Sequence, residues 1–245
     1  MQCDRNNEFN LLFTLTQLCL STMILCIDNV LTSEELEQIH LSLKDAAFVD
    51  GKLTAGTYAK TVKENYQLKG DSGAAKEVRA IVNQALKRNS LFQTAVRPKA
   101  IRPLLFSRYE AGMFYGMHTD NALMGDDVLT RSDVSLTLFL NDPNTYSGGE
   151  LVIDTSLGEQ FFKLAAGSMI VYPSTFLHRV AEVAEGVRLA AVTWVHSIVR
   201  DAHEREMLFE LDTVRRATFE KHGKTVEFDL LCKLHANLLR KWAEV

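Results

Sequence analysis

Eight short apolar runs lie between Pro98 and His196, and they constrain the fold more than any other feature of the chain. Turn-forming Gly, Pro, Asn or Asp residues separate most of them. The runs cover residues 101–109, 114–120, 134–140, 150–154, 160–163, 168–172, 178–183 and 187–196. Short strands at this spacing are typical of a sandwich or barrel, and a double-sheet jelly roll is the natural eight-strand arrangement. We therefore predict a jelly-roll core, a double-stranded β-helix, over residues 98–199.

Helical patterns precede this core. An apolar strand at 24–30 leads to a helix start in which Thr32 or Ser33 would be the cap, with acidic residues in the first turn. A second helix is predicted over 74–95 from apolar residues near helical spacing. The glycine-containing segment 50–72 is expected to be irregular or hairpin-like.

Two more helices are predicted after the core, over 201–220 and 225–243. The second carries one apolar stripe, Phe228, Leu231, Leu234, Leu238 and Trp242. Such a stripe usually packs within its own chain, but a partner-binding role stays open. The predicted fold is mainly β with flanking helices: a jelly-roll core, two N-terminal helices against one sheet, and a C-terminal helical pair.

Composition narrows the class of protein. In 245 residues, 47% are hydrophobic and 24% charged, as in an ordinary soluble globular protein. The net charge is −4 without a basic run, so we expect no nucleic-acid partner. The four cysteines, Cys3, Cys19, Cys26 and Cys232, form no Cys-x-x-Cys pair, which fits reduced thiols and a cytoplasmic location.

The N-terminal segment 1–22 is interpreted as an extension outside the fold. Its apolar run over 11–26 is interrupted by polar residues and is too short for a confident membrane span. Asp4 and Glu8 against a single Arg5 make a poor signal peptide. Met23, immediately before a predicted strand, would be a natural start. We therefore predict no membrane association, a main domain over 23–199 and a helical segment over 200–245.

Three residues within the predicted core have the chemistry of metal ligands. His118 and Asp120 are two apart, so on a strand both side chains face the same side. His178 opens a later strand, after a Pro-Ser turn. Two imidazoles and one carboxylate suit a non-haem Fe(II) centre that keeps coordination positions open. Taken singly, His-x-Asp is a weak motif, and His178 alone fits a capped or core histidine better than a ligand.

Arg188 strengthens this interpretation. It follows His178 by ten residues, which allows a strand, a turn at Gly186 and a return on the neighbouring strand. A buried guanidinium needs an anion. A dicarboxylic acid that chelates the metal could supply it, because arginine binds carboxylates bidentately. The alternative is an internal salt bridge to Glu150 or Asp154.

The combination of segments 108–120, 146–151, 166–180 and 186–194 resembles the Fe(II)- and 2-oxoglutarate-dependent dioxygenases. Within their prolyl 4-hydroxylase-like branch it is similar to the bacterial PKHD-type hydroxylases. The likeness covers roughly residues 23–200 and, more loosely, the helical tail.

This resemblance implies a role for each candidate residue. His118, Asp120 and His178 would bind Fe(2+), and Arg188 would bind the distal carboxylate of 2-oxoglutarate. Tyr109 would contact the co-substrate, although packing beside the site would explain it equally well. Dioxygen is the second co-substrate and L-ascorbate (vitamin C) the expected reductant. The reaction would hydroxylate a small-molecule or peptide substrate and convert 2-oxoglutarate to succinate.

Competing functions are weaker. A related halogenase would lack a carboxylate at Asp120, and an AlkB-type demethylase would carry an arginine where Trp194 stands. A non-catalytic jelly-roll module that senses a metal or ligand is the main alternative, and a scaffold that binds partners through the tail is another. The segment 121–132 is either a lid or an ordinary surface loop. The tail is compatible with a homodimer, and the identity of the prime substrate is not readable.

Overall fold

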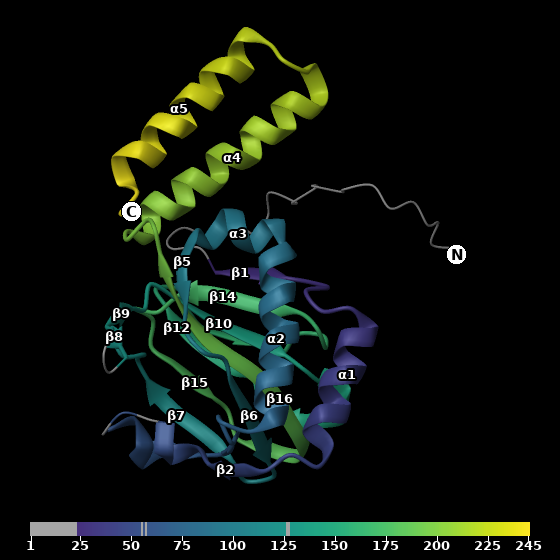
Figure 1. Cartoon of the computed structure of the whole chain (residues 1–245). Helices are drawn as coiled ribbons and strands as arrows, with labels where there is room; N and C mark the ends of the chain where they lie inside the picture. The colour runs from purple at the N-terminus through teal and green to yellow at the C-terminus, as the bar shows by residue number, and fades with distance from the viewer. Residues whose placement is uncertain (1–23, 55, 57, 126–127) are drawn as a thin grey trace.

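Two antiparallel sheets form the centre of the computed structural model, which describes residues 24–54, 56, 58–125 and 128–245 (Figure 1). The larger sheet follows the order β1 (Leu25–Ile27), β14 (Met169–Pro173), β10 (Val134–Phe139), β16 (Val183–Ser197), β6 (Leu105–Glu110), β4 (Tyr66–Leu68), β2 (Phe48–Asp50), with β5 (Pro98–Ile101) and β11 (Tyr146–Gly148) paired to β16. The jelly-roll prediction is thereby confirmed.

The second sheet supplies the other wall of the jelly roll. Its order is β13 (Gly158–Phe162), β12 (Leu151–Thr155), β15 (His178–Val180), β7 (Phe114–His118), β3 (Lys63–Glu64). A separate hairpin, β8 (Leu123–Met124) and β9 (Thr130–Arg131), follows β7 in the chain. Every residue of β10 is buried, because this central strand is covered on both faces. Its sequence still alternates, because Ser135 and Thr137 line the cavity between the sheets while the leucines beside them pack in the core.

The N-terminal helices pack on the outer face of the larger sheet (Figure 1). Helix α1 (Ser33–Lys44) starts at Thr32, which forms the predicted cap as a capping box with Glu35. The helix predicted over 74–95 is instead two helices, α2 (Gly73–Arg88) and α3 (Ser90–Val96). Asn89 lies between them in an extended conformation and its side chain accepts a hydrogen bond from the Phe92 amide at 2.8 Å, so it caps α3.

Segment 50–72 is more ordered than its composition predicts. Besides β3 and β4 it contains two 3₁₀ turns, η2 (Gly51–Thr54) and η3 (Ala59–Val62). A third such turn, η4 (Pro143–Thr145), precedes β11. The short strands pair with β7 and β6, which follow much later in the chain. Long-range pairing of this kind leaves no local signal in two or three residues, which is why the sequence pattern missed them.

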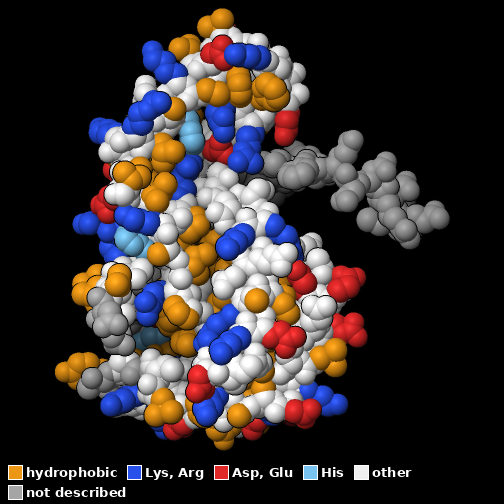
Figure 2. All heavy atoms as spheres, viewed as in Figure 1, with side chains coloured by type: hydrophobic (Ala, Val, Ile, Leu, Met, Phe, Trp, Pro, Cys, Tyr) orange, Lys and Arg blue, Asp and Glu red, His pale blue; other side chains and the backbone are white. Residues whose placement is uncertain are grey.

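The C-terminal pair, α4 (Ala202–His222) and α5 (Val226–Trp242), projects away from the sheets (Figure 1). No described residue of α5 is buried, and its apolar stripe is only partly covered by α4. Leu230 and Leu234 are 58% and 49% exposed, and Figure 2 shows apolar side chains on the surface of this pair. Within the described part of the chain, no helix combines the length and apolarity needed to cross a membrane.

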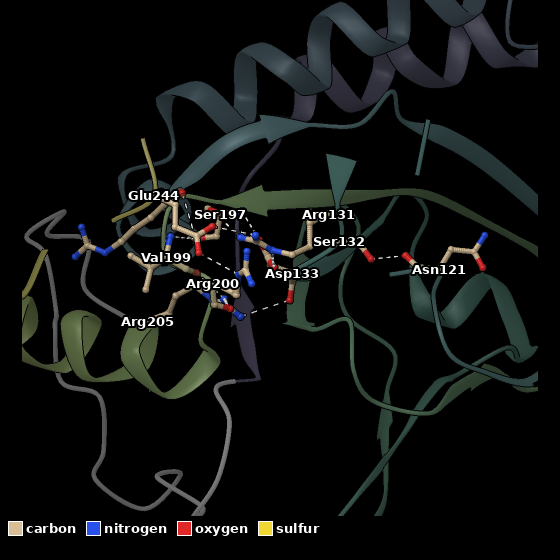
Figure 3. Close-up of polar contacts among 10 residues, drawn as sticks. Asn121, Arg131, Ser132, Asp133, Ser197, Val199, Arg200, Arg205 and Glu244 are labelled. Carbon is tan, nitrogen blue, oxygen red and sulfur yellow. Dashed lines mark hydrogen bonds and ion pairs between the residues drawn. The ribbon is translucent and has the colours of Figure 1, made fainter. Parts of the chain in front are cut away.

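A polar network ties the base of this pair to the core (Figure 3). Arg131 pairs with Asp133 (Nε to Oδ1, 2.6 Å) and with Glu244 near the C-terminus (Nη1 to Oε2, 3.0 Å). Asp133 also accepts a hydrogen bond from the Ser197 amide at 2.8 Å. Arg205 of α4 donates to two backbone carbonyls of the β16–α4 connection, at 2.7 and 2.8 Å. Each of these buried charges therefore has several partners.

Candidate functional site

The two candidate histidines meet across neighbouring strands. His118 ends β7, His178 begins β15, and the two are paired residues in the antiparallel register. Their ring centroids are 4.3 Å apart. Asp120 follows β7 directly, and its Oδ2 lies 3.7 Å from Nε2 of His178. One ligand atom from each residue lies within 4.8 Å of the others. The structure thus brings these three residues, hereafter the metal trio, to one point.

The backbone orients both imidazoles. Nδ1 of His118 lies 2.8 Å from the carbonyl of Gly116, and Nδ1 of His178 lies 3.2 Å from that of Phe176. A hydrogen bond from Nδ1–H to a carbonyl leaves Nε2 as the free lone pair for a metal. Burial, together with the neighbouring His178, lowers the pKa of His118 to about 4. The His118 ring is therefore neutral at pH 7, which is the form that binds metals.

The carboxylate of Asp120 is held by a relay of hydroxyl groups that sequence reasoning missed. Oγ of Ser135 donates to Oδ2 of Asp120 at 2.5 Å, and Oγ of Ser174 lies 2.8 Å from Oγ of Ser135. Ser135 comes from β10 and Ser174 from the turn after β14, so both hydroxyls belong to the larger sheet. The sequence offered one indication of this relay, which is that Ser174 lies in the Pro-Ser turn before His178. The relay fixes the carboxylate toward the two imidazoles.

Arg188 lies inside the jelly roll on β16, opposite Tyr109 of β6 in the strand register. Its side chain is only 1% exposed. The guanidinium carbon lies 5.2 Å from the ring centroid of Tyr109 and 5.5 Å from that of Phe139. Within the described residues, Nε and Nη2 have no hydrogen-bond partner.

The alternative salt bridge of Arg188 to Glu150 or Asp154 does not occur among the described ion pairs. A buried guanidinium without a carboxylate is costly, because the desolvation of its charge is not offset. Tyr109, itself buried, lines the same space, and burial raises the pKa of its hydroxyl. It therefore stays a neutral group that can donate a hydrogen bond. The arrangement calls for an external anion beside Arg188.

One cavity of about 500 Å³ joins the metal trio, Arg188 and Tyr109 between the two sheets. Leu123, Met124 and Gly125 of the β8–β9 hairpin also line it. The segment 121–132 thus contributes to the wall of the cavity, although its central residues 126–127 lie outside the described part. The volume suits a small co-substrate together with part of a second molecule.

The residues of the cavity fit a ferrous ion and a dicarboxylic acid. Two imidazoles and one carboxylate on one side of a metal are the ligand set of non-haem Fe(II) oxygenases. The partnerless nitrogens of Arg188 match a carboxylate, which arginine binds through two parallel hydrogen bonds. The arrangement can therefore hold an iron at the metal trio and orient an acid between that iron and β16.

Comparison with known proteins agrees with this geometry. Residues 104–196 match the family described as the 2OG-Fe(II) oxygenase superfamily, and residues 202–244 match the PKHD-type hydroxylase C-terminal domain. A PKHD-type hydroxylase of Thermosynechococcus vestitus is 66% identical over 224 residues, 91% of this chain and 100% of the relative. One from Crocosphaera subtropica is 57% identical over 222 residues, with the same coverage.

Solved structures share the fold at low sequence identity. A prolyl hydroxylase from Trichoplax adhaerens, in complex with a hypoxia inducible factor peptide fragment, has a TM-score of 0.52 and 16% identity, over 76% of this chain and 86% of that one. HygX from Streptomyces hygroscopicus, with nickel and 2-oxoglutarate bound, has a TM-score of 0.51 and 17% identity, over 72% and 83%. Likeness at this level concerns the jelly-roll fold.

Proposed function

Because this chain belongs to the PKHD-type hydroxylases, which depend on Fe(II) and 2-oxoglutarate, we propose that the metal trio binds the iron and Arg188 binds the co-substrate. The protein is an Fe(II)- and 2-oxoglutarate-dependent hydroxylase that uses dioxygen. The residue assignment rests on two features that occur together in one cavity. Three ligand atoms lie within 4.8 Å of one another, and a buried guanidinium with partnerless nitrogens faces the same cavity.

Iron and 2-oxoglutarate, when bound, would activate dioxygen, the oxidant: one oxygen atom converts a substrate C–H bond to C–OH, and the other enters succinate as 2-oxoglutarate loses carbon dioxide. The chain's own residues position the reactants. Arg188 holds the distal carboxylate of the co-substrate, and the Tyr109 ring packs on the guanidinium and limits its rotation. Ser135 keeps the Asp120 carboxylate turned toward the imidazoles. The buried walls of both sheets keep bulk water away from the reacting atoms.

Several finer assignments belong to the same proposal. Tyr109 contributes its hydroxyl to the co-substrate, and L-ascorbate restores iron that has been oxidised without product formation. The prime substrate is a peptide or amino-acid side chain or a small molecule, and the enzyme works in the cytoplasm. Residues 1–22 lie outside the described part of the chain and are proposed to lie outside the functional domain. Residues 23–199 form the oxygenase domain, and 98–199 its catalytic core.

The helical segment 200–245 is proposed to mediate a homodimer. Its exposed apolar side chains support this, since Leu230, Leu234 and Phe219 are each about half exposed or more. Packing these three side chains against a second copy of the chain would bury them. Sedimentation of the full chain and of a Leu230→Glu, Leu234→Glu double variant tests the assignment. A monomer for the parent chain would contradict it.

The residue assignment is tested by succinate formation from 2-oxoglutarate with Fe(II) under air. We expect the parent chain to form succinate and His118→Ala to form none. Thr119→Ala is the matched control, because Thr119 lies between two members of the trio but is not one of them. Turnover by His118→Ala at the parental rate would contradict the assignment of the metal ligands.

A further inference from the structure

Lys63 is a second buried cation in the cavity, and the function proposed above leaves it without a role. It lies on β3 at the edge of the smaller sheet and is 4% exposed. Its Nζ lies 4.9 Å from the ring centroid of Tyr115, which in turn stacks on His118 with centroids 3.7 Å apart. A single aromatic side chain thus contacts both the ammonium and a member of the metal trio.

The ammonium of Lys63 has little compensation from the protein. It donates a hydrogen bond to Oγ1 of Thr54, at 3.2 Å. Asp50 and Asp120 act on it at longer range, but no carboxylate within the described residues forms an ion pair with it. The Thr54 hydroxyl itself donates to Oε1 of Gln67, so it meets Lys63 as a neutral acceptor. An ammonium has three donors. Burying one with a single neutral acceptor costs free energy that only a bound anion would offset.

This cation does not belong to the co-substrate's carboxylates. Arg188 provides for the distal carboxylate from the larger sheet, and the keto acid end is directed to the metal trio. Lys63 enters the cavity from the other sheet, on the segment that runs through η3. The sum of charges in the cavity supports this. Iron(II) and dianionic 2-oxoglutarate cancel each other. Asp120 offsets one of the two buried cations, Arg188 and Lys63, so one positive charge remains. Arg102, which also lines the cavity, adds to that excess.

We propose that Lys63 is a specificity-determining residue that binds an oxyanion of the prime substrate, a carboxylate or a phosphate ester, beside the metal trio. The C–H bond to be oxidised then lies within a few atoms of that anion, because the ammonium and His118 contact the same Tyr115 ring. This deepens the proposed hydroxylase function: neutral and cationic molecules are poor substrates, and anionic amino-acid, peptide or small-molecule groups are good ones.

The test compares matched anionic and neutral probes by calorimetry. One arm uses N-acetylated amino acids with a free carboxylate against their primary amides. The second arm uses N-acetyl-O-phosphoserine amide against N-acetylserine amide. Both arms are run on the iron- and 2-oxoglutarate-loaded chain without oxygen and on the metal-free chain. We expect the parent protein to bind the anionic member of at least one pair about tenfold more tightly, and the better arm identifies the oxyanion.

Three variants make the test specific. Lys63→Met keeps the length of the side chain without its charge and is expected to reduce the preference to within about twofold. Lys63→Arg is expected to retain part of it. Lys52→Met is the matched control, since Lys52 lies on the same segment but pairs with Glu64 outside the cavity and should keep the full preference. Thermal unfolding of Lys63→Met checks its fold, and we expect a melting temperature at or above that of the parent.

Three results would overturn the assignment of Lys63: no anion preference in the parent protein in either arm, an unchanged preference in Lys63→Met, or a loss of 2-oxoglutarate binding in Lys63→Met as large as in an Arg188 variant. Failure of the hydroxylase proposal looks different. In that case 2-oxoglutarate does not bind to the iron-loaded parent chain, while the anion preference is still measurable in the metal-free protein.

Discussion

Buried charges occur in two regions of this molecule, and they are treated in opposite ways. At the base of the helical pair, Arg131, Asp133 and Arg205 are each bonded to several protein groups (Figure 3). In the cavity, Arg188 has two nitrogens without a partner and Lys63 has one neutral acceptor. Saturated charges hold the tail to the core. Charges without protein partners mark positions where a ligand must supply the counter-charge. The charged groups of the first region therefore serve structure, and those of the second serve binding.

Removal of a metal ligand should have the largest effect. We expect Asp120→Ala to lower substrate-independent succinate formation by at least about a thousandfold, which corresponds to roughly 4 kcal/mol in the activation barrier. The carboxylate is one of the three protein ligands that we propose, and its side chain is 7% exposed. Glu159→Gln, a surface change on β13, should leave the rate near that of the parent. Parental activity in Asp120→Ala would remove Asp120 from the site.

Asp133→Ala should be the most destabilising change outside the cavity. It leaves the Ser197 amide without its acceptor and Arg131 with Glu244 alone, and breaking a buried pair of this kind costs about 3–5 kcal/mol. Urea unfolding measures the loss directly. A free energy of unfolding within about 1 kcal/mol of the parent would mean that the network is not structural.

Arg188→Met should weaken ligand binding without lowering stability, the reverse of what we expect for Asp133→Ala. We expect binding of 2-oxoglutarate to weaken by roughly 2–4 kcal/mol, as when one partner of a buried charge contact is removed. The unliganded variant should be at least as stable as the parent, because the guanidinium has partnerless nitrogens in the described structure. Calorimetric titration and urea unfolding of the same preparation check both statements. A large loss of stability with normal binding would reverse the assignment.

The buried ammonium of Lys63 should make the free energy of unfolding depend on pH. Burial lowers its pKa from 10.5 to about 8. Between these values the unfolded chain holds a proton that the folded chain has released, so this group makes stability rise with pH across the window of about 8 to 10.5. Below pH 8 the full cost of burying the charge is present, roughly 3 kcal/mol from the difference between these two pKa values.

The variant Lys63→Met removes that cost. It should therefore be more stable than the parent at pH 7, and the difference should shrink as the pH rises toward 10.5. Unfolding of both proteins in urea at pH 7, 9 and 10.5 measures this. A variant that is less stable than the parent at pH 7 would show that the ammonium is well paired in the folded chain.

The sequence predicted the jelly roll and the members of the cavity that have distinctive chemistry. His118 ends β7, and Asp120 lies two residues later, past the end of that strand. The predicted turn at Gly186 between His178 and Arg188 is wrong, because Gly186 lies within β16, and β15 belongs to the other sheet. The structure nevertheless brings all four residues to one cavity. The N-terminal cap at Thr32 was equally readable. What local pattern could not supply was pairing between distant segments, which is why β3 was missed and Lys63 with it.

Other features were not predicted from the sequence for related reasons. Ser135 and Lys63 belong to common residue types, and only their positions beside the metal trio make them distinctive. Asn89 splits the second helix through one side-chain hydrogen bond, although the apolar spacing continues across it. The apolar stripe of α5 was expected to pack within the chain, and four of its five residues are partly covered, with Phe228 against Phe219 of α4, whereas Leu234 is exposed. Periodicity shows that a face is apolar, but it does not show what covers that face.

The most direct test of the account is an anaerobic titration of the Fe(II)-loaded chain with 2-oxoglutarate, followed by the charge-transfer absorption that an iron-chelated keto acid produces. We predict one co-substrate per chain, loss of the band in His178→Ala, and a band in Arg188→Met that requires much more 2-oxoglutarate to saturate. A full band at parental affinity in both variants would contradict the central claim that the buried, unsaturated charges of the cavity form the iron and co-substrate site.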